Sequence, residues 1–95
     1  PKGKVDLILC VDVYYEFSYP EQMLAAMREA LSPRGNVVLV EFRGEDVNVP
    51  IKPEHKMTKA QVMKELVPNG FRLTKSFDKL PWQHMLWFSR DDAPE

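Results

Sequence analysis

The hydrophobic positions along this chain form two kinds of run, and their order predicts a mixed α/β fold. Residues 5–11 (VDLILCV) and 37–42 (VVLVEF) are almost continuously apolar, which is typical of strands buried on both faces of a parallel sheet. Between them apolar residues recur at helical spacing and form one stripe: Met23, Leu24, Met27, Ala30 and Leu31. A strand, a helix and a second parallel strand make a right-handed βαβ crossover.

Short polar motifs predict where this helix begins and ends. Ser18 followed three positions later by Glu21 matches a capping box, and Pro20 is tolerated in a first helical turn. The run Ser32-Pro33-Arg34-Gly35 stops the helix, and Gly35 is able to take a left-handed turn conformation there.

The second half of the chain begins with a stretch that has no periodicity. Residues 43–57 contain Gly44, Pro50 and Pro53 among charged residues and predict a long loop without regular structure, of the kind that often covers a functional site. Thr58 and Gln61 predict a second capping box that opens a short helix.

Two strands and a tail complete the pattern. Pro68-Asn69-Gly70 closes the short helix, and residues 71–77 partly alternate apolar with polar side chains, as in a strand near a sheet edge. Residues 83–89 (QHMLWFS) form a last strand, and residues 91–95 are a polar tail. The whole chain, 1–95, is one domain at most.

Composition excludes several classes of partner. A net charge of −1 offers no general attraction to nucleic acid or to an anionic membrane. No apolar run approaches the ~18 residues that span a bilayer, and no signal peptide opens the sequence, so a cytoplasmic location is expected. Cys10 reads as a buried structural thiol, and Cys10, His55 and His84 lack metal-ligand spacing. Pro1 fits both a natural start and the edge of a fragment.

The candidate site follows the first strand. Asp12, Tyr14, Tyr15 and Glu16 come directly after it. Ligands of open α/β sheets bind outside the carboxyl ends of the strands, so these residues stand where chemistry is expected. In the structural alternative, the two acids cap or solvate a strand end while the tyrosines pack.

Several segments resemble one enzyme family in the same order. They are residues 11–17 (VDVYYEF), 39–43 (LVEFR), 51–53 (IKP), 55–58 (HKMT) and 80–84 (LPWQH). With these segments the chain, from Val5 to Phe88, resembles the C-terminal half of a class I S-adenosylmethionine-dependent methyltransferase, as found in bacterial methyltransferase-domain proteins.

The resemblance implies a partial domain over residues 1–95. Its fold would be half of a Rossmann-like methyltransferase sheet with strand order 4-5-7-6, the last strand antiparallel, and two main helices. The four strands would be residues 5–11, 37–42, 71–77 and 83–89, in the order 4, 5, 6 and 7.

S-adenosylmethionine is the cofactor that the resemblance implies, with an incomplete site. The family's glycine-rich loop and its ribose-binding acid precede strand 4, and no G-x-G occurs here. We therefore expect the isolated chain to be inactive or to bind the cofactor weakly. A small-molecule substrate is expected, because the strand-4 loop lacks the Asn/Asp-Pro-Pro-aromatic signature of enzymes acting on base nitrogens or glutamine amides.

Residue roles follow from the same resemblance. The cofactor-binding candidates are Asp12, Val13 and Tyr14, and the catalytic candidates are Tyr15 and Glu16. The candidates for the substrate wall are Glu41, Arg43, His55, Trp82 and His84. Each wall residue has a structural alternative: a surface ion pair for Glu41 with Arg43, a solvated loop charge for His55, a packing anchor for Trp82 and a hydrogen-bonded structural role for His84.

A second function class remains open from the sequence. The first strand would expose a hydrogen-bonding edge and apolar side chains if nothing precedes it in the sheet. Such a chain would be a non-enzymatic α/β interaction module that self-associates as a homodimer or larger homo-oligomer through that edge. Half of a nicotinamide-dependent dehydrogenase is disfavoured, because the dinucleotide fingerprint does not occur.

Overall fold

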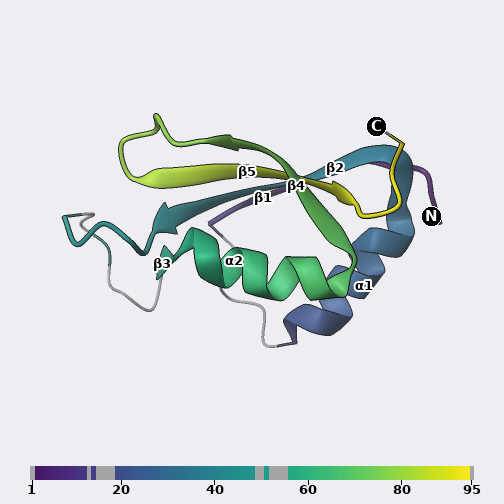
Figure 1. Cartoon of the computed structure of the whole chain (residues 1–95), viewed down its shortest axis with the longest axis horizontal. Coiled ribbons are helices and arrows are strands. Elements are labelled where there is room, and N and C mark those ends of the chain that lie inside the picture. Colours follow the sequence, from purple (N-terminus) through teal and green to yellow (C-terminus); the bar gives the residue numbers. More distant parts are fainter. Residues whose placement is uncertain (1, 13, 15–18, 49–50, 52–55, 95) are drawn as a thin grey trace.

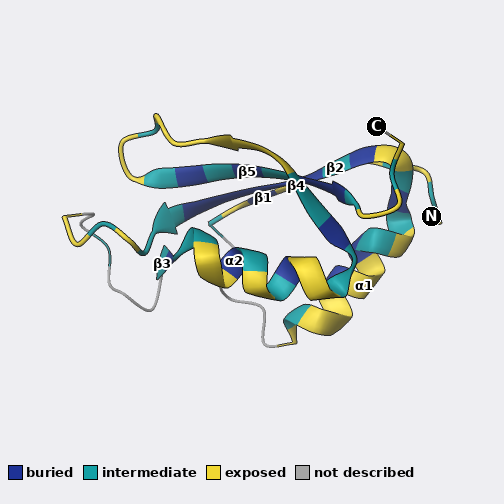
Figure 2. Cartoon of the chain, in the orientation of Figure 1, coloured by how far each residue is buried: buried dark blue, intermediate teal, exposed yellow. Residues whose placement is uncertain are grey.

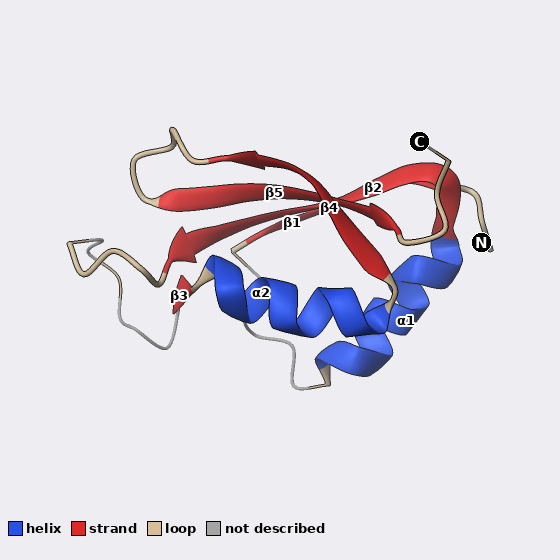
Figure 3. Cartoon of the chain, in the orientation of Figure 1, coloured by secondary structure: helices blue, strands red, loops and turns tan. Residues whose placement is uncertain are grey.

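The computed structural model describes residues 2–12, 14, 19–48, 51 and 56–94 (Figure 1). Helices and strands follow in this order: β1 (Val5–Val11), α1 (Pro20–Ala30), β2 (Leu31–Arg43), β3 (Lys56–Met57), α2 (Lys59–Leu66), a 3-10 turn (Val67–Asn69), β4 (Phe71–Phe77) and β5 (Gln83–Arg90). Figure 3 shows the strands gathered in one sheet with both helices below it. The predicted α/β class is confirmed.

The sheet has the strand order β1-β2-β5-β4. β1 runs parallel to β2, and β5 lies antiparallel between β2 and β4. This is the arrangement that the resemblance predicted, including the position of the last strand. The two-residue strand β3 pairs in parallel with Phe42 and Arg43 of β2. It lies on the same side of β2 as β1, past the point where the pairing with β1 ends, whereas β5 pairs with the other side.

Both helices cover the same face of the sheet, and the core lies between them and that face (Figure 1). The strand residues that face the helices alternate along each strand, as the pleat requires. They include Cys10, Val37, Leu39, Leu86 and Phe88, all buried in one cluster with Leu24 and Leu66 of the helices. Cys10 is a buried free thiol, as expected.

The opposite face of the sheet is apolar and is not covered by either described helix. Leu7, Leu9 and Val11 of β1 are 59%, 56% and 47% exposed. Figure 2 shows this strand largely in the colour of exposed residues. The prediction that β1 is buried on both faces is therefore wrong for the chain described here, because the strand stands at the end of the sheet. Val38 and Val40, on the next strand, are buried.

The turn between α1 and β2 differs from the prediction. β2 starts at Leu31, immediately after the helix, and its pairing with β1 passes from Val5–Leu31 to Leu7–Asn36, so three extra residues lie in β2. Gly35 does not use the left-handed conformation that is open to it. Its role is close approach, because a β-carbon there would lie 2.7 Å from the Val5 carbonyl oxygen and 2.8 Å from Leu31 Cδ1.

The start of α1 also differs. The residue before the helix is Tyr19, which provides no side-chain cap. Ser18, the cap that the sequence predicted together with Glu21, lies outside the described residues. Pro20 opens the helix as expected. Met23, which the predicted apolar stripe included, is 42% exposed. The buried residues of α1 are Leu24 and Met27.

The second helix begins as predicted. Thr58 Oγ1 accepts a hydrogen bond of 3.0 Å from the Gln61 backbone nitrogen. The Gln61 side chain turns away from Thr58 and donates to Glu65. Gly70, with a φ of 91°, ends the helical segment in the left-handed region that glycine tolerates best.

The loop and the tail are more ordered than the sequence predicted. β3 adds regular structure inside the predicted 43–57 loop. In the tail, the Asp91 backbone nitrogen donates to the Gly70 carbonyl, and its carboxylate accepts from Arg28 at 2.7 Å. Within the described ranges, no helix combines the length and apolar character that crossing a bilayer requires.

Candidate functional site at the carboxyl ends of β1 and β2

Asp12 ends β1 in an unusual backbone conformation. Its φ is 55°, in the left-handed region that costs a non-glycine residue about 1 kcal/mol, although aspartate tolerates it better than most residues. Its backbone nitrogen donates to the Val40 carbonyl at 2.7 Å. The Gln83 amide nitrogen donates to both carboxylate oxygens, at 2.8 and 2.9 Å. Strained residues of this kind cluster at functional sites, which supports the candidacy of Asp12.

Gln83 is a site residue that the sequence analysis did not name. It stands 71 positions from Asp12. The signal in the sequence was its place beside Trp82 and His84, at the start of the last strand. No spacing rule connects residues so far apart, and the contact exists because β5 lies next to β2 in the sheet.

Tyr14 is buried against α2. Its side chain is 1% exposed, and its hydroxyl donates a 2.7 Å hydrogen bond to Glu65 Oε1. Burial raises the pKa of Tyr14 far above its ordinary value, and the hydrogen bond and the charges of Glu65 and Glu41 raise it further. Tyr14 is therefore a neutral phenol that ties the segment after β1 to α2, and it cannot act as a base near neutral pH.

Glu41 is a buried acid near the end of β2, on the face that the helices cover. Its side chain is 2% exposed, so the alternative of a surface ion pair with Arg43 is wrong. Burial raises the pKa of the Cys10 thiol, and the nearby charge of Glu41 adds to that rise. A thiol in this state is a poor nucleophile, because the thiolate is the reactive form.

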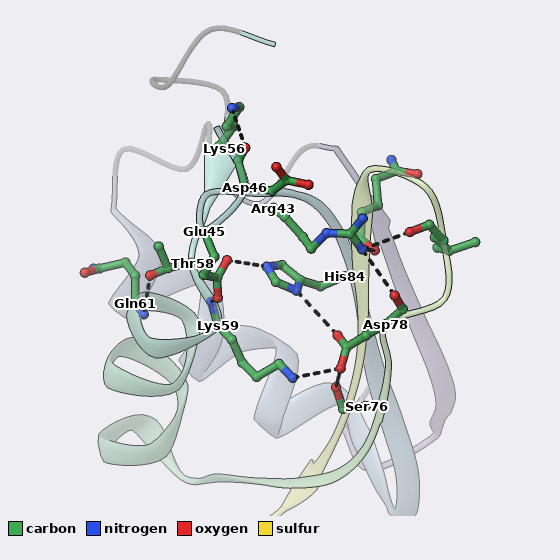
Figure 4. Close-up of polar contacts among 12 residues, drawn as sticks. Arg43, Glu45, Asp46, Lys56, Thr58, Lys59, Gln61, Ser76, Asp78 and His84 are labelled. Atoms are coloured by element: carbon green, nitrogen blue, oxygen red, sulfur yellow. Dashed lines mark hydrogen bonds and ion pairs between the residues drawn. The ribbon is translucent and has the colours of Figure 1, made fainter. Parts of the chain in front are cut away.

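Arg43 holds the turn between β4 and β5. Its Nη1 donates to the carbonyls of Leu80 and Gln83 at 2.8 and 3.0 Å, and to that of Asp78 at 3.3 Å. Its Nη2 donates to the Pro81 carbonyl, and its backbone nitrogen donates to the Trp82 carbonyl. Figure 4 shows the guanidinium pointing into this turn. Arg43 thereby fixes the backbone that carries Trp82 and Gln83.

His84 is a buried ring that contacts a partly exposed polar network. The ring is 3% exposed, and its Nε2 is 2.8 Å from Glu45 Oε1 while its Nδ1 is 3.7 Å from Asp78 Oδ1 (Figure 4). Lys59 completes the network, because its backbone nitrogen donates to Glu45 Oε2 and its Nζ lies 3.1 Å from Asp78 Oδ2. His84 is thus hydrogen-bonded, as its structural alternative expects, and its place in a substrate wall stays a prediction.

Trp82 presents its side chain to solvent. It is 51% exposed, so its role as a packing anchor is not supported. It stands in the turn that Arg43 holds, directly before Gln83. An accessible indole on a fixed turn is suited to contact a ligand.

The structure brings some predicted residues together and leaves others apart. Asp12 is joined through Gln83 to β5, and Arg43, Trp82 and His84 gather around the β4–β5 turn. Tyr14 points to α2, away from that turn. Val13, Tyr15, Glu16 and His55 lie outside the described residues, and their roles stay predictions.

Two further observations concern whether the carboxyl edge of the sheet can hold a metal ion or another ligand. Among the described residues, no group of three histidine, cysteine, aspartate or glutamate side chains is arranged to hold a metal ion. An open hollow of about 570 Å³ lies at the other end of the sheet, lined by Lys2, Arg28, Asn69 and Arg90 among others. Its arginines are engaged by Asp91 and Asp92, so it adds nothing to the carboxyl edge.

Comparison with known proteins identifies the fold. No protein-family model matches the chain, and no curated protein matches it. A putative type 11 methyltransferase from Sulfolobus solfataricus matches with a TM-score of 0.84 at 19% identity, over 100% of this chain and 55% of that one.

Two other solved structures agree. An S-adenosylmethionine-dependent methyltransferase from Aquifex aeolicus matches with a TM-score of 0.82 at 18% identity, over 93% of this chain and 47% of that one. A TehB-like methyltransferase from Corynebacterium glutamicum matches with a TM-score of 0.68 at 16% identity, over 94% and 49%. The chain spans about half the length of these structures. It therefore has part of the Rossmann-like fold of S-adenosylmethionine-dependent methyltransferases.

Proposed function

We propose that this chain is the substrate-side half of an S-adenosylmethionine-dependent methyltransferase that acts on a small molecule. The observation that carries the proposal is the sheet itself. In this sheet two parallel strands are followed by an antiparallel strand inserted before the edge strand. The chain matches a putative methyltransferase over 100% of its length and a second methyltransferase over 93%. A strained Asp12 and a fixed turn with an accessible Trp82 stand at the edge where such sheets bind ligands.

One flank of a cofactor site is consistent with the residues present. S-adenosylmethionine supplies a methyl group on a sulfonium cation, and a carboxylate with nearby aromatic rings suits a soft cation. Asp12 provides a carboxylate at the edge, held in place by Gln83. Asp12, Val13 and Tyr14 are the proposed cofactor contacts, Tyr14 through its backbone, because its side chain is buried against α2. The outer side of β1 is exposed, so the opposite flank of the cofactor site would have to come from a segment other than those described. We therefore expect the chain alone to bind the cofactor weakly or not at all.

The remaining candidates line the proposed substrate wall. Tyr15 and Glu16 would stand nearest the reacting atoms, and Glu41, Arg43, His55, Trp82 and His84 would form the wall. Among the described ones, Trp82 has the exposure to touch a substrate, and Arg43 acts by holding the turn. Glu41 and His84 are buried, so they would support the wall from within the fold. Their work in an in-line methyl transfer is alignment and the exclusion of water.

Calorimetry on two proteins tests the proposal. The first is this chain, and the second is a chimera in which the chain replaces the matching 55% of the Sulfolobus solfataricus protein. We expect the chimera to bind S-adenosylmethionine and the chain alone to show no measurable heat, with Asp12→Ala weakening the chimera. Low-micromolar binding by the chain alone would overturn the half-site proposal. A chimera that folds by circular dichroism yet binds nothing would overturn the methyltransferase assignment.

A second candidate function rests on β1. Its three exposed apolar side chains and its outer edge, which no described strand pairs, favour a non-enzymatic module that self-associates. An edge-to-edge pair of chains would extend the sheet and bury that edge. A molar mass of two chains in light scattering, with no cofactor binding by the chimera, would favour this function over the first.

A further inference from the structure

The outer face of the sheet, which points away from both helices, consists of two rows of side chains that cross the sheet from β1 to β4. The rows are Leu9-Val38-Trp87-Lys75 and Val11-Val40-Met85-Phe77. Figure 3 shows both described helices on the opposite side of the sheet. The outer face is therefore an apolar surface that neither of them covers.

The uncovered part of this face lies mainly on β1. Val38 and Val40 on β2 are buried, because the side chains of the two neighbouring strands flank them. At the β4 end of its row, the Lys75 ammonium lies 4.8 Å from the centroid of the Trp87 ring and covers part of it. At the β1 end nothing described covers Leu9 or its neighbours Leu7 and Val11, and each is about half exposed.

The two edges of the sheet differ in composition. The edge strand β4 contains Arg72 and Lys75, and Thr74 is an extra residue in its pairing with β5. Basic side chains and bulges are devices that protect an edge facing solvent. β1 contains no basic residue and no proline, and its one charged side chain, Asp6, accepts a hydrogen bond from Ser32 on β2. Its composition is that of a strand inside a larger sheet.

A second copy of the chain would cover only half of this surface. Two copies paired through the outer edges of β1 would satisfy the backbone groups of the edge, but the outer faces of both copies would stay uncovered. Two copies stacked face to face would cover the apolar side chains and leave both edges open. An occupant of edge and face together must contribute a strand beside β1 and a further element over the outer face.

We propose that the outer edge and the outer face of β1 form a docking surface for a strand–helix unit. Its strand runs parallel to β1, because a nearly continuous apolar run is typical of strands inside parallel sheets. The match to the Sulfolobus solfataricus protein covers 55% of that chain, so that protein has a further segment long enough to supply such a unit. The inference rests on the fold and not on the proposed activity.

The handedness of crossovers places the helix of this unit on the outer face. Right-handed crossovers that run in opposite directions along a sheet put their helices on opposite faces. α1 connects β1 to β2 and lies on the inner face, with the core. A crossover that leaves the docked strand in the direction away from β1 therefore places its helix on the outer face. There its apolar stripe would contact Leu7, Leu9 and Val11.

Hydrogen exchange tests this surface on the chain alone and on the chimera described above, which contains the remaining segment of the Sulfolobus solfataricus protein. We expect the amides of β1 to exchange at least about tenfold more slowly in the chimera than in the chain alone, because the docked strand protects them. The amides of β4, at the other edge, should exchange alike in both proteins. Equal exchange of β1 in the two proteins would overturn the proposal.

A charge on the outer face of β1 gives a second test. Leu9 is 56% exposed in the chain, so Leu9→Lys should change its melting temperature little. In the chimera the same change should lower the melting temperature by about 5 °C or more, because the docked helix would bury the ammonium group. Phe77→Lys, at the β4 end of the outer face, is the matched control and should have the same effect in both proteins. An effect of Leu9→Lys that is equal in chain and chimera contradicts the docking surface.

Light scattering separates this occupant from a second copy. If the chain alone is a dimer whose β1 amides are as protected as those of the chimera, the surface belongs to a second copy and the proposal is wrong. If the chimera does not fold by circular dichroism, the remaining segment is added to the chain as a separate polypeptide. A one-to-one complex then supports the proposal, and its absence overturns it.

The docking surface and the proposed function can fail separately, because none of these measurements involves the cofactor. A chimera that protects β1 but binds no S-adenosylmethionine would keep the docking surface and refute the function. A chimera that binds the cofactor while β1 exchanges as fast as in the chain alone would do the reverse.

Discussion

The side-chain amide of Gln83 donates to both carboxylate oxygens of Asp12, at 2.8 and 2.9 Å. This contact fixes the end of β1 against the start of β5, across β2. It also holds a carboxylate at the edge of the sheet in a defined orientation, on a backbone in the left-handed region.

Removing this amide should destabilise the fold measurably. Gln83→Ala deletes a part-buried hydrogen bond to a charged group, so we expect a loss of about 1–2 kcal/mol in the free energy of unfolding. Urea unfolding followed by tryptophan fluorescence measures it. Gln22→Ala, on the exposed side of α1, is the matched control and should change stability by less than about 0.5 kcal/mol. Equal stability of the two variants would show that the contact contributes nothing.

Gly35 should tolerate no side chain. In Gly35→Ala the new methyl group would press on the Val5 carbonyl and on Leu31, which is fully buried, so the turn into β2 must shift. We expect a loss of about 1–3 kcal/mol, the usual cost of overpacking. Arg34→Ala, at the exposed neighbouring position, should be close to neutral. Denaturant midpoints that coincide for these two variants would contradict the close approach.

Tyr14 should make the stability of the folded chain fall at alkaline pH. Its folded pKa is raised, so the stability it contributes is fully present below the ordinary tyrosine pKa of about 10 and is lost as pH rises beyond that value. Tyr14→Phe should cost about 1–2 kcal/mol near neutral pH, through the lost hydrogen bond to Glu65. The difference between wild type and variant should shrink above about pH 10.

The matched control is Tyr19→Phe. Tyr19 is 73% exposed, so this change should leave both stability and its alkaline slope unaltered. Thermal unfolding from about pH 7 to 11 compares the three proteins over the tyrosine range. A slope shared by wild type and Tyr14→Phe would mean that Tyr14 is not the group responsible.

Glu45 and Asp78 should contribute to stability above acidic pH. Their folded pKa values are lowered, so their contribution is present above the ordinary values of about 4.3 and 3.9 and is lost as pH falls through the folded values. Glu45→Gln should lower the melting temperature at neutral pH and converge with wild type below about pH 4. Glu29→Gln, an exposed change on α1, is the control. A neutral-pH melting temperature unaffected by Glu45→Gln would refute this contribution.

The exposed face of β1 should govern association of the isolated chain. Leu9→Lys places a charge in the middle of the apolar strand, where charged side chains prevent edge pairing. If the chain self-associates through β1, this variant should be a monomer in light scattering at concentrations where wild type is a dimer. Val47→Lys is the control, because Val47 is 89% exposed but lies away from the strand. Monomeric wild type at high concentration would count against the self-associating module.

The local pattern of the sequence determined where most strands and helices lie, but not the start of β2 at Leu31 or the short strand β3. The predicted bounds of β1, β4 and β5 match the structure to within a residue at each end. The cap at Thr58 was predicted from the four residues 58–61 alone. Strand periodicity and helix capping depend on neighbours in the chain, so they can be read without knowing the fold. The resemblance added the strand order, which local pattern alone does not give.

Tertiary structure decided the contacts that make the site. Gln83 meets Asp12 across 71 positions, Tyr14 meets Glu65 across 51, and His84 meets Glu45 across 39. These contacts follow from the insertion of β5 between β2 and β4 and from the packing of α2 on one face. Burial also had to come from the fold, because an apolar run such as that of β1 is buried only where another element covers it. The sequence therefore specified the elements, and their packing specified which side chains meet.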